Sequence, residues 1–183
     1  MTGIRMQLDG QAGTLEELDG YVKRASNPTG MFENIGAMLV TSTQHRFDTG
    51  VGVDGSPWPP SLRALKTGGK TLIETARLYR SFAYQASASG LEFGTNVIYA
   101  AIQQWGGDIL QHARTAVLHF KTNKRTGQSR FAKPGKADRA RKAEIGARTI
   151  HMPARPFIGI DADDERSILN IAETWLAGEG VAP

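Results

Sequence analysis

Two stretches decide how this chain folds: Gly94–Gly107, with the sequence GTNVIYAAIQQWGG, and Met152–Ile160, with the sequence MPARPFIGI. Neither stretch contains a pair of carboxylates, a cysteine or a histidine. Both combine aromatic residues with Gly and Pro residues of the kind that fix a backbone path at a packing surface. They therefore indicate a structural protein rather than an active site.

The composition narrows the class of protein further. The chain has 183 residues, 40% of them apolar, and no cysteine. This length suits one hydrophobic core, so residues 1–183 are predicted to form a single domain. The lack of cysteine excludes disulfides, thiolate metal sites and cysteine nucleophiles. No run of 18 apolar residues occurs, and the N-terminus lacks an apolar segment, so we expect a soluble protein made in the cytoplasm.

The net charge of +4 is unevenly distributed. One segment, Lys121–Lys142, contains nine basic residues and a single acid, Asp138, and so carries +8. Its basic residues are Lys121, Lys124, Arg125, Arg130, Lys133, Lys136, Arg139, Arg141 and Lys142. The remaining chain carries −4, so a mildly acidic body bears one strongly basic segment.

A first, short helix is predicted near the N-terminus. Thr14 and Glu17 have the spacing of a capping box, in which each side chain would bind the other residue's backbone amide. Leu15, Leu18 and Val22 then share one face of a helix that ends near residue 26.

Two longer helices are predicted near residues 31–48 and 163–177. The first has apolar residues at helical spacing and ends at Gly50. The second follows the acids of Asp161–Glu165, which suit the positive end of a helix, and ends at Gly178. Its predicted buried face comprises Ile168, Leu169, Ala172, Trp175 and Leu176.

Strands are predicted between these helices. Phe82–Ser87 and Leu91–Phe93 flank a Ser89-Gly90 turn and indicate a hairpin. Further elements are strands at residues 113–120 and 147–152, a short helix at residues 99–105 and a Gly- and Pro-rich loop arm at residues 51–70. Together these elements predict an α+β fold, with a small antiparallel sheet packed against the two longer helices and with extended loop arms.

The basic segment, residues 121–142, is predicted to be an arm inserted between two strands and mobile until bound. Phe131 is its only large apolar side chain, which cannot offset an ordering entropy of roughly 1–2 kcal/mol per residue. Three interpretations stay open: a solvated loop, docking onto an acidic protein surface, and contact with nucleic-acid phosphates. A single Phe makes no stacking platform, so sequence-specific base recognition is not expected.

No catalytic grouping emerges from the sequence. His112 and His119 are seven residues apart, which places them on opposite faces of a strand. The acids of Asp161–Glu165 lack the Gly and the distal Glu of a calcium loop. We therefore expect no catalytic residue, no metal site, no cofactor and no small-molecule substrate.

Several apolar and polar residues are candidates for an interface. Trp58 is either a core anchor or buried against a neighbouring subunit. Arg155 lies between two prolines, which orient its guanidinium toward a carboxylate on another element or another chain. The predicted subunit or partner interface consists of Trp58, Pro59, Pro60, Tyr99, Gln104, Trp105, Arg155 and Phe157.

The order of the motifs resembles the phage virion morphogenesis, or tail-completion, family of Mu-like and related tailed phages. The resemblance rests on WPPS at residues 58–61, LIETARLYRS at residues 72–81, GTNVIYAAIQQWGG, and PARPFIGI before a C-terminal helix. It spans about residues 31–176. Two departures stand out: the family usually has Gly where Ala76 stands, and often His-Gln where Gln103-Gln104 stands. Alanine at position 76 could replace a tight turn by a continuing helix. Glutamine at position 103 in place of histidine leaves no acid–base role there.

The resemblance implies a structural virion protein of the head–tail junction, and not an enzyme. It would act as a tail-completion, tail-terminator or neck protein, assembled in the host cytoplasm and located in the virion. Its implied partners are further copies of itself in a ring, with a hexamer favoured, together with the tail tube and neck or connector proteins, but no membrane. The alternative is a DNA-binding packaging or architectural factor that acts through the basic arm, for example by non-specific contact with DNA in the channel.

Overall fold

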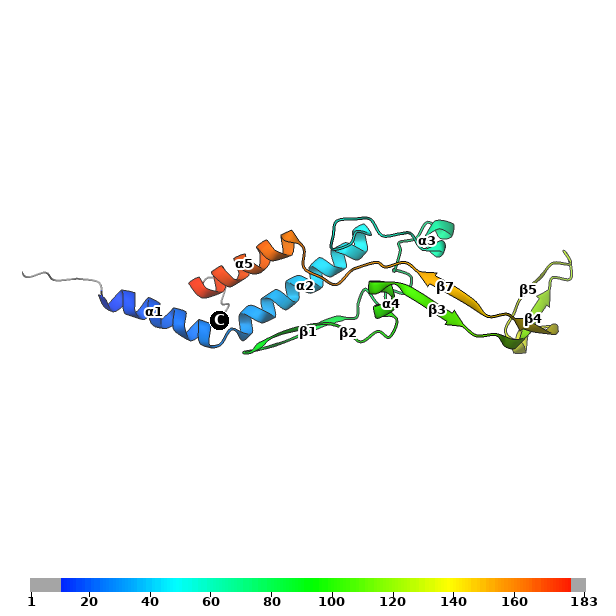
Figure 1. The fold of residues 1–183 in the computed structure, drawn as a ribbon, viewed down its shortest axis with the longest axis horizontal. Coiled ribbons are helices and arrows are strands. Elements are labelled where there is room, and N and C mark those ends of the chain that lie inside the picture. Colours follow the sequence, from blue (N-terminus) through cyan, green and yellow to red (C-terminus); the bar gives the residue numbers. More distant parts are fainter. Residues whose placement is uncertain (1–10, 179–183) are drawn as a thin grey trace, which may run out of the picture. The chain divides into compact units, whose positions relative to one another are not determined.

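The computed structural model describes residues 11–178, which form an α+β fold of two compact units (Figure 1). The main unit comprises residues 11–105 and 154–178, and the inserted unit comprises Gly106–Pro153. The expectation of a single domain stays a prediction.

The main unit is layered around one long helix, α2 (Thr29–Thr49). Helix α5 (Ala162–Ala177) packs on one side of α2, and the antiparallel hairpin of β1 (Phe82–Ser87) and β2 (Gly90–Thr95) packs on the other (Figure 1). This arrangement confirms the predicted α+β fold with a small antiparallel sheet; the hairpin packs against α2, and α5 packs against the other side of that helix rather than against the sheet. Gly36 of α2 makes the close approach possible, since a Cβ there would lie 2.4 Å from the ring of Tyr84 in β1.

The core of the main unit is aromatic. Phe157 is fully buried, and the ring of Phe47 lies 5.3 Å from the rings of both Phe157 and Trp58. Phe82 at the start of β1 and Leu78 complete the centre of this cluster. Because Phe157 and Trp58 lie far from α2 in sequence, their packing fixes the loops that carry them onto the helix and hairpin.

Helix α5 begins as the sequence predicts. Asp161 is its N-cap: the carboxylate accepts from the backbone amides of Asp163 and Asp164, and the Asp164 side chain accepts from the Asp161 amide. The predicted buried face is wrong in part. Leu169 is 63% exposed and Leu176 is also exposed, so the helix packs through a narrower stripe than its spacing indicates.

Helix α1 (Gln11–Ser26) extends beyond the predicted start. Thr14 lies inside this helix, so the predicted capping box at Thr14 is wrong. The apolar face of Leu15, Leu18 and Val22 exists as predicted, but all three side chains are exposed. An exposed apolar face of this kind matters for the function proposed below.

Residues 51–70 are more structured than a loop arm. An isolated bridge joins Val51 to Pro57, and Trp58 is buried in the core of its own chain. A short helix, α3 (Leu62–Thr67), follows, with Ser61 as N-cap. The expectation of an extended arm is therefore wrong from Trp58 onward, because the tryptophan anchors the segment.

The segment from residue 71 to 81 contains no helix. Two of its non-glycine residues have positive φ, Leu72 at 63° and Ala76 at 57°. The helix that Ala76 was expected to allow does not form. Instead the left-handed turn is kept despite the Cβ of alanine, which strains the backbone by about 1–2 kcal/mol.

The inserted unit consists of two small antiparallel sheets. In one, β3 (Gly107–Gln111) pairs with β7 (Arg148–Met152). In the other, β4 (Arg114–Thr122) lies between β5 (Ser129–Phe131) and β6 (Arg139–Ile145), and a 3-10 turn, η1 (Pro134–Lys136), connects the outer two. The arm predicted at residues 121–142 thus contains strand structure, which corrects the expectation of a structureless loop; its mobility stays a prediction. The prediction considered only the apolar side chains within the arm. It did not include the backbone hydrogen bonds to β4, a strand with apolar residues at alternate positions.

Candidate functional site

The two opening motifs meet in the main unit through the side chain of Gln104. Helix α4 (Ala100–Trp105) carries this residue, whose Oε1 accepts from the amides of Phe157 and Ile158 at 2.9 and 3.0 Å. Its Nε2 donates to the carbonyl of Ile158 at 2.8 Å. A single buried amide thus pairs with an extended backbone segment as a neighbouring strand would.

Arg155 extends this connection to the WPPS motif. Its Nε donates to the carbonyl of Pro59 at 2.8 Å, and its Nη1 donates to Oε1 of Gln103 at 3.0 Å. Trp58 Nε1 donates to the carbonyl of Pro156 at 3.2 Å. Burial lowers the pKa of Arg155 from its usual value. The Arg155 side chain therefore binds another element of its own chain. Of the two predicted locations for its partner, another element or another chain, the structure shows the first.

Arg46 of α2 holds the same segment from the other side. This buried guanidinium donates to the carbonyls of Phe157 and Gly159, at 3.2 and 3.0 Å, and pairs with Asp161 and Asp164. The hydrogen bond from Arg46 holds the pKa of Asp161 below its usual value. We call this set of bonds around residues 155–159, made by Arg46, Gln104 and Arg155, the polar clamp.

The clamp decides which predicted interface residues are accessible. The side chains of Trp58, Gln104, Arg155 and Phe157 are buried within the main unit, so their assignment to a subunit interface is corrected: they hold the chain's own motifs together. Pro59, Pro60, Tyr99 and Trp105 are exposed, and their role at an interface stays a prediction. The sequence offers no direct signal for this division, because the residue before Pro59 is buried and the residue after Gln104 is exposed without any regular period.

An exposed apolar surface lies next to the clamp. Ile98 is 95% exposed and Trp105 is 76% exposed, and Tyr99 lies beside Ile98 in the chain. Between α4 and residues 157–158 runs an open groove of about 290 Å³, with Ala101 and Trp105 among its lining residues. The sequence analysis did not identify Ile98 as an interface residue. The pattern of apolar residues in this motif is equally compatible with a buried and with an exposed Ile98.

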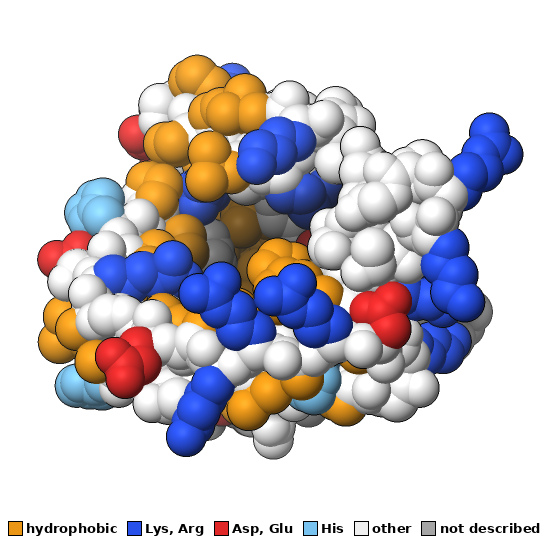
Figure 2. Space-filling model, turned by 90° about the vertical axis from the view of Figure 1, so that its right-hand side faces the viewer, with side chains coloured by type: hydrophobic (Ala, Val, Ile, Leu, Met, Phe, Trp, Pro, Cys, Tyr) orange, Lys and Arg blue, Asp and Glu red, His pale blue; other side chains and the backbone are white. Residues whose placement is uncertain are grey.

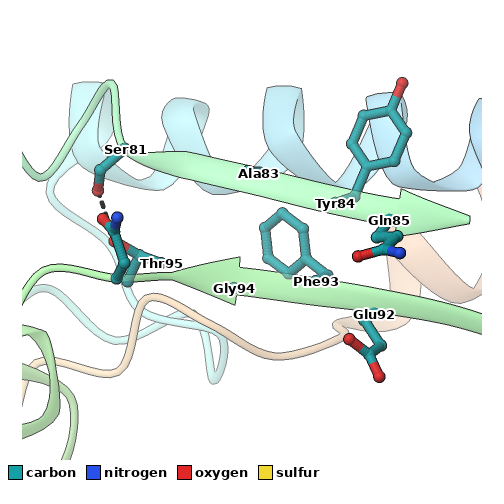
Figure 3. Close-up of a pocket in the computed structure, with 9 residues that line it drawn as sticks. Ser81, Ala83, Tyr84, Gln85, Glu92, Phe93, Gly94 and Thr95 are labelled. Atoms are coloured by element: carbon teal, nitrogen blue, oxygen red, sulfur yellow. Dashed lines mark hydrogen bonds between the residues drawn. The ribbon is translucent and has the colours of Figure 1, made fainter.

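The hairpin forms a second open groove, of about 420 Å³ (Figure 3). The hydroxyls of Ser81 and Thr95 share a hydrogen bond of 2.6 Å at one end of it. Gln85 and Glu92 are cross-strand partners on one face, and Tyr84 and Phe93 are partners on the other. Glu92 is the only carboxylate in the lining, which gives the groove no acid–base pair.

The inserted unit carries the basic surface. Its 48 residues include eleven Lys and Arg and three Asp and Glu, a net charge of +8, and within the described residues none of the eleven forms an ion pair with an acid. Figure 2, which views the side where Figure 1 shows β4 and β5, has Lys and Arg side chains spread over much of the surface. All nine residues of the predicted basic arm are exposed.

No cluster of His, Cys, Asp or Glu suitable for a metal ion occurs in residues 11–178. His112 lies between β3 and β4 and His119 lies within β4, so the two are not on a helix. His151 is a cross-strand partner of Asp108, with its Nδ1 2.8 Å from the carboxylate. Likewise, none of the helices in the described part of the chain is long and apolar enough to cross a membrane.

A family model matches residues 12–177, which covers both units from α1 through α5. The chain belongs to the phage virion morphogenesis family. This family is one of structural and assembly proteins rather than a known class of enzyme, so the protein has a role in phage virion assembly. No curated protein and no solved structure matches the chain. The bounds of the match lie on either side of the inserted unit, residues 106–153.

Proposed function

We propose that this virion-assembly protein is a tail-completion protein of the head–tail junction, working as a tail-terminator or neck subunit in a ring of identical copies. A hexamer is the favoured ring. The tail tube and the neck or connector proteins are its proposed partners.

The observation that carries this proposal is the presence of two different exposed apolar surfaces on the main unit. One is the face of α1 formed by Leu15, Leu18 and Val22, and the other is formed by Ile98, Tyr99 and Trp105. Exposed apolar surfaces on a folded unit mark protein contacts. When the two contacting surfaces differ, each copy binds the next in a head-to-tail manner, and such contacts form a ring when the rotation from copy to copy closes on itself.

The polar clamp supports the same proposal. A ring subunit must present its contact surfaces at fixed positions, since any change of angle is repeated at every contact. The clamp fixes α4, which carries Trp105, to residues 155–159 and through Arg46 to α2. The exposed surface around α4 is thus attached to the most rigid part of the main unit.

Native mass spectrometry and negative-stain imaging test the proposal, with the full chain alone and with tails purified from particles that lack it. The expected result is a closed ring, either free or at the end of the tail. Monomers in both preparations would overturn the proposal.

A pair of variants locates the contact. Replacement of both Ile98→Ser and Trp105→Ala should abolish ring formation and head–tail joining while the circular dichroism spectrum stays unchanged. The control is Leu169→Ser, which removes an exposed apolar side chain from α5. Equal losses in both variants would count against a contact at α4.

A further inference from the structure

The strongest unexplained feature is a cavity of about 1030 Å³ in the inserted unit, formed where β4 and β5 join and where η1 returns. Four cationic side chains line it: Lys121, Lys124, Arg130 and Lys136. We call this group the cationic cavity. Its other lining residues are small or polar, with Asn123 and Ser129 among them.

Two of these cations are held directly opposite each other. Lys121 of β4 and Arg130 of β5 are cross-strand partners, so their side chains leave the same face of the sheet with Cβ atoms roughly 4.5–5.5 Å apart. Like charges in this position destabilise a sheet. Neither cation forms an ion pair within the described residues, so an anion from outside the chain would relieve this repulsion.

The one acid of the cavity does not neutralise it. Asp138 Oδ2 accepts from the backbone amide of Thr122 at 2.8 Å, and Asp138 makes no ion pair among the described residues. This bond fastens the connection after η1 to the end of β4. Asp138 therefore shapes the cavity, and the positive charge of the four cations stays available.

The density of negative charge on the two candidate partners, an acidic protein surface and DNA, distinguishes between them. In the main unit the acids are scattered, and several already bind cations of the same unit: Asp48 with Lys70, Asp161 with Arg46, and Asp163 with Arg166. A neighbouring copy thus offers only part of its acids, because six of the thirteen described acids of the main unit are already in ion pairs. Duplex DNA, in contrast, carries one charge per roughly 1.7 Å of its axis.

The placement of the aromatic residues distinguishes duplex from single-stranded DNA. Phe131 is exposed but stacks on Phe120, with ring centroids 5.1 Å apart. This pair is on the sheet face opposite to Lys121 and Arg130, as the cross-strand register requires. The residues that line the cationic cavity include no aromatic side chain, and the ring that the register places on the same sheet face, the imidazole of His119, is half-buried.

From these observations we infer that the cationic cavity binds the phosphate backbone of duplex DNA without sequence preference. The contact is electrostatic, made by Lys and Arg side chains to phosphate oxygens. The inference does not depend on ring formation, so it can fail or succeed separately from the proposed function.

Fluorescence anisotropy with a labelled duplex of mixed sequence, at several salt concentrations, tests the inference on the full chain. The dissociation constant should be about 10⁻⁴–10⁻⁶ M at physiological salt, the range of non-specific binding. The triple variant Lys121→Gln, Arg130→Gln and Lys136→Gln should reduce the slope of log K against log salt by about 3, at roughly 0.9 per lost phosphate contact.

A matched control removes the same charge from the other face. Arg114, Arg139 and Arg141 are exposed and share the face of Phe120. Replacing all three with Gln should change the salt slope by less than half as much, and both triple variants should keep the circular dichroism spectrum. Equal changes in slope, no binding of duplex at low salt, or tighter binding of single-stranded DNA or of poly-glutamate would each overturn the inference.

Discussion

The main unit and the inserted unit treat charged side chains in opposite ways. The main unit surrounds Arg46 and Arg155 with carbonyl and carboxylate oxygens and buries both. The inserted unit exposes its cations and opposes Lys121 to Arg130. A buried charge with partners fixes a structure, whereas an exposed charge without partners is available to an external ligand. Buried, paired cations and exposed, unpaired cations are thus separated into two units of one chain.

The largest effect should follow from breaking the buried ion pair of the main unit. Arg46→Leu leaves Asp164 buried without its cation, which should destabilise the protein by about 3–5 kcal/mol. Thermal unfolding monitored by circular dichroism measures the loss. Arg166→Leu breaks the exposed pair with Asp163 and serves as control, with an expected change below about 1 kcal/mol. Similar shifts for the two variants would contradict the role of the clamp.

The second ion pair of Arg46, with Asp161, predicts how stability depends on pH. Because Arg46 lowers the pKa of Asp161, the carboxylate stabilises the fold above the unfolded value of 3.8. That contribution is lost as the pH falls through the lowered, folded-state pKa. Urea unfolding between pH 7 and pH 2 should therefore show an acid loss of stability that is smaller in Arg46→Leu than in the wild type. An identical pH profile in both proteins would argue against the assignment.

A smaller loss is expected from the amide of the clamp. Gln104→Leu leaves the buried amide of Phe157 without its acceptor, which costs about 1–3 kcal/mol for that group. Gln85→Leu changes an exposed glutamine of the hairpin and should alter stability by less than about 0.5 kcal/mol. Denaturant midpoints of the two variants give the comparison. A loss no greater than that of the control would show that the bonds of Gln104 contribute nothing.

The strained turn of the main unit should become more stable on substitution. Ala76→Gly removes the Cβ from a residue with a φ of 57° and should stabilise the protein by about 1 kcal/mol. For a chain of this size that corresponds to a rise in Tm of about 2–4 °C. Ala86→Gly, within strand β1, should lower Tm instead. A fall in Tm for Ala76→Gly would refute the strained turn.

The smallest effect concerns the inserted unit. Lys121→Glu turns the pair with Arg130 from like to opposite charges, which should stabilise the sheet by about 0.2–1 kcal/mol and weaken DNA binding at the same time. Hydrogen exchange of the β4 and β5 amides, together with anisotropy, measures both. Lys133→Glu, outside the strands, should leave the exchange rates unchanged. Faster exchange in Lys121→Glu would contradict the proposed repulsion.

Much of the local structure is predictable from the sequence. Asp161 at the start of α5 and Gly50 and Gly178 at helix ends each determine a boundary through bonds within a few residues. The predicted hairpin forms, with its turn at Ala88-Ser89, one residue earlier than predicted, and with Gly90 as the first residue of β2. The prediction fails at Thr14, where the helix begins earlier, and at Ala76, where a left-handed turn persists against the preference of alanine. In the second case the surrounding packing outweighs a local preference of one or two kcal/mol.

The sequence by itself determined the segregation of charge, the α+β class and the motifs that identify the family. Only the tertiary structure decided that Trp58, Gln104, Arg155 and Phe157 face inward, and that Lys121 lies opposite Arg130. The physical reason is distance along the chain. Gln104 and Phe157 are 53 residues apart, and no local periodicity records which side chains will meet across such a separation.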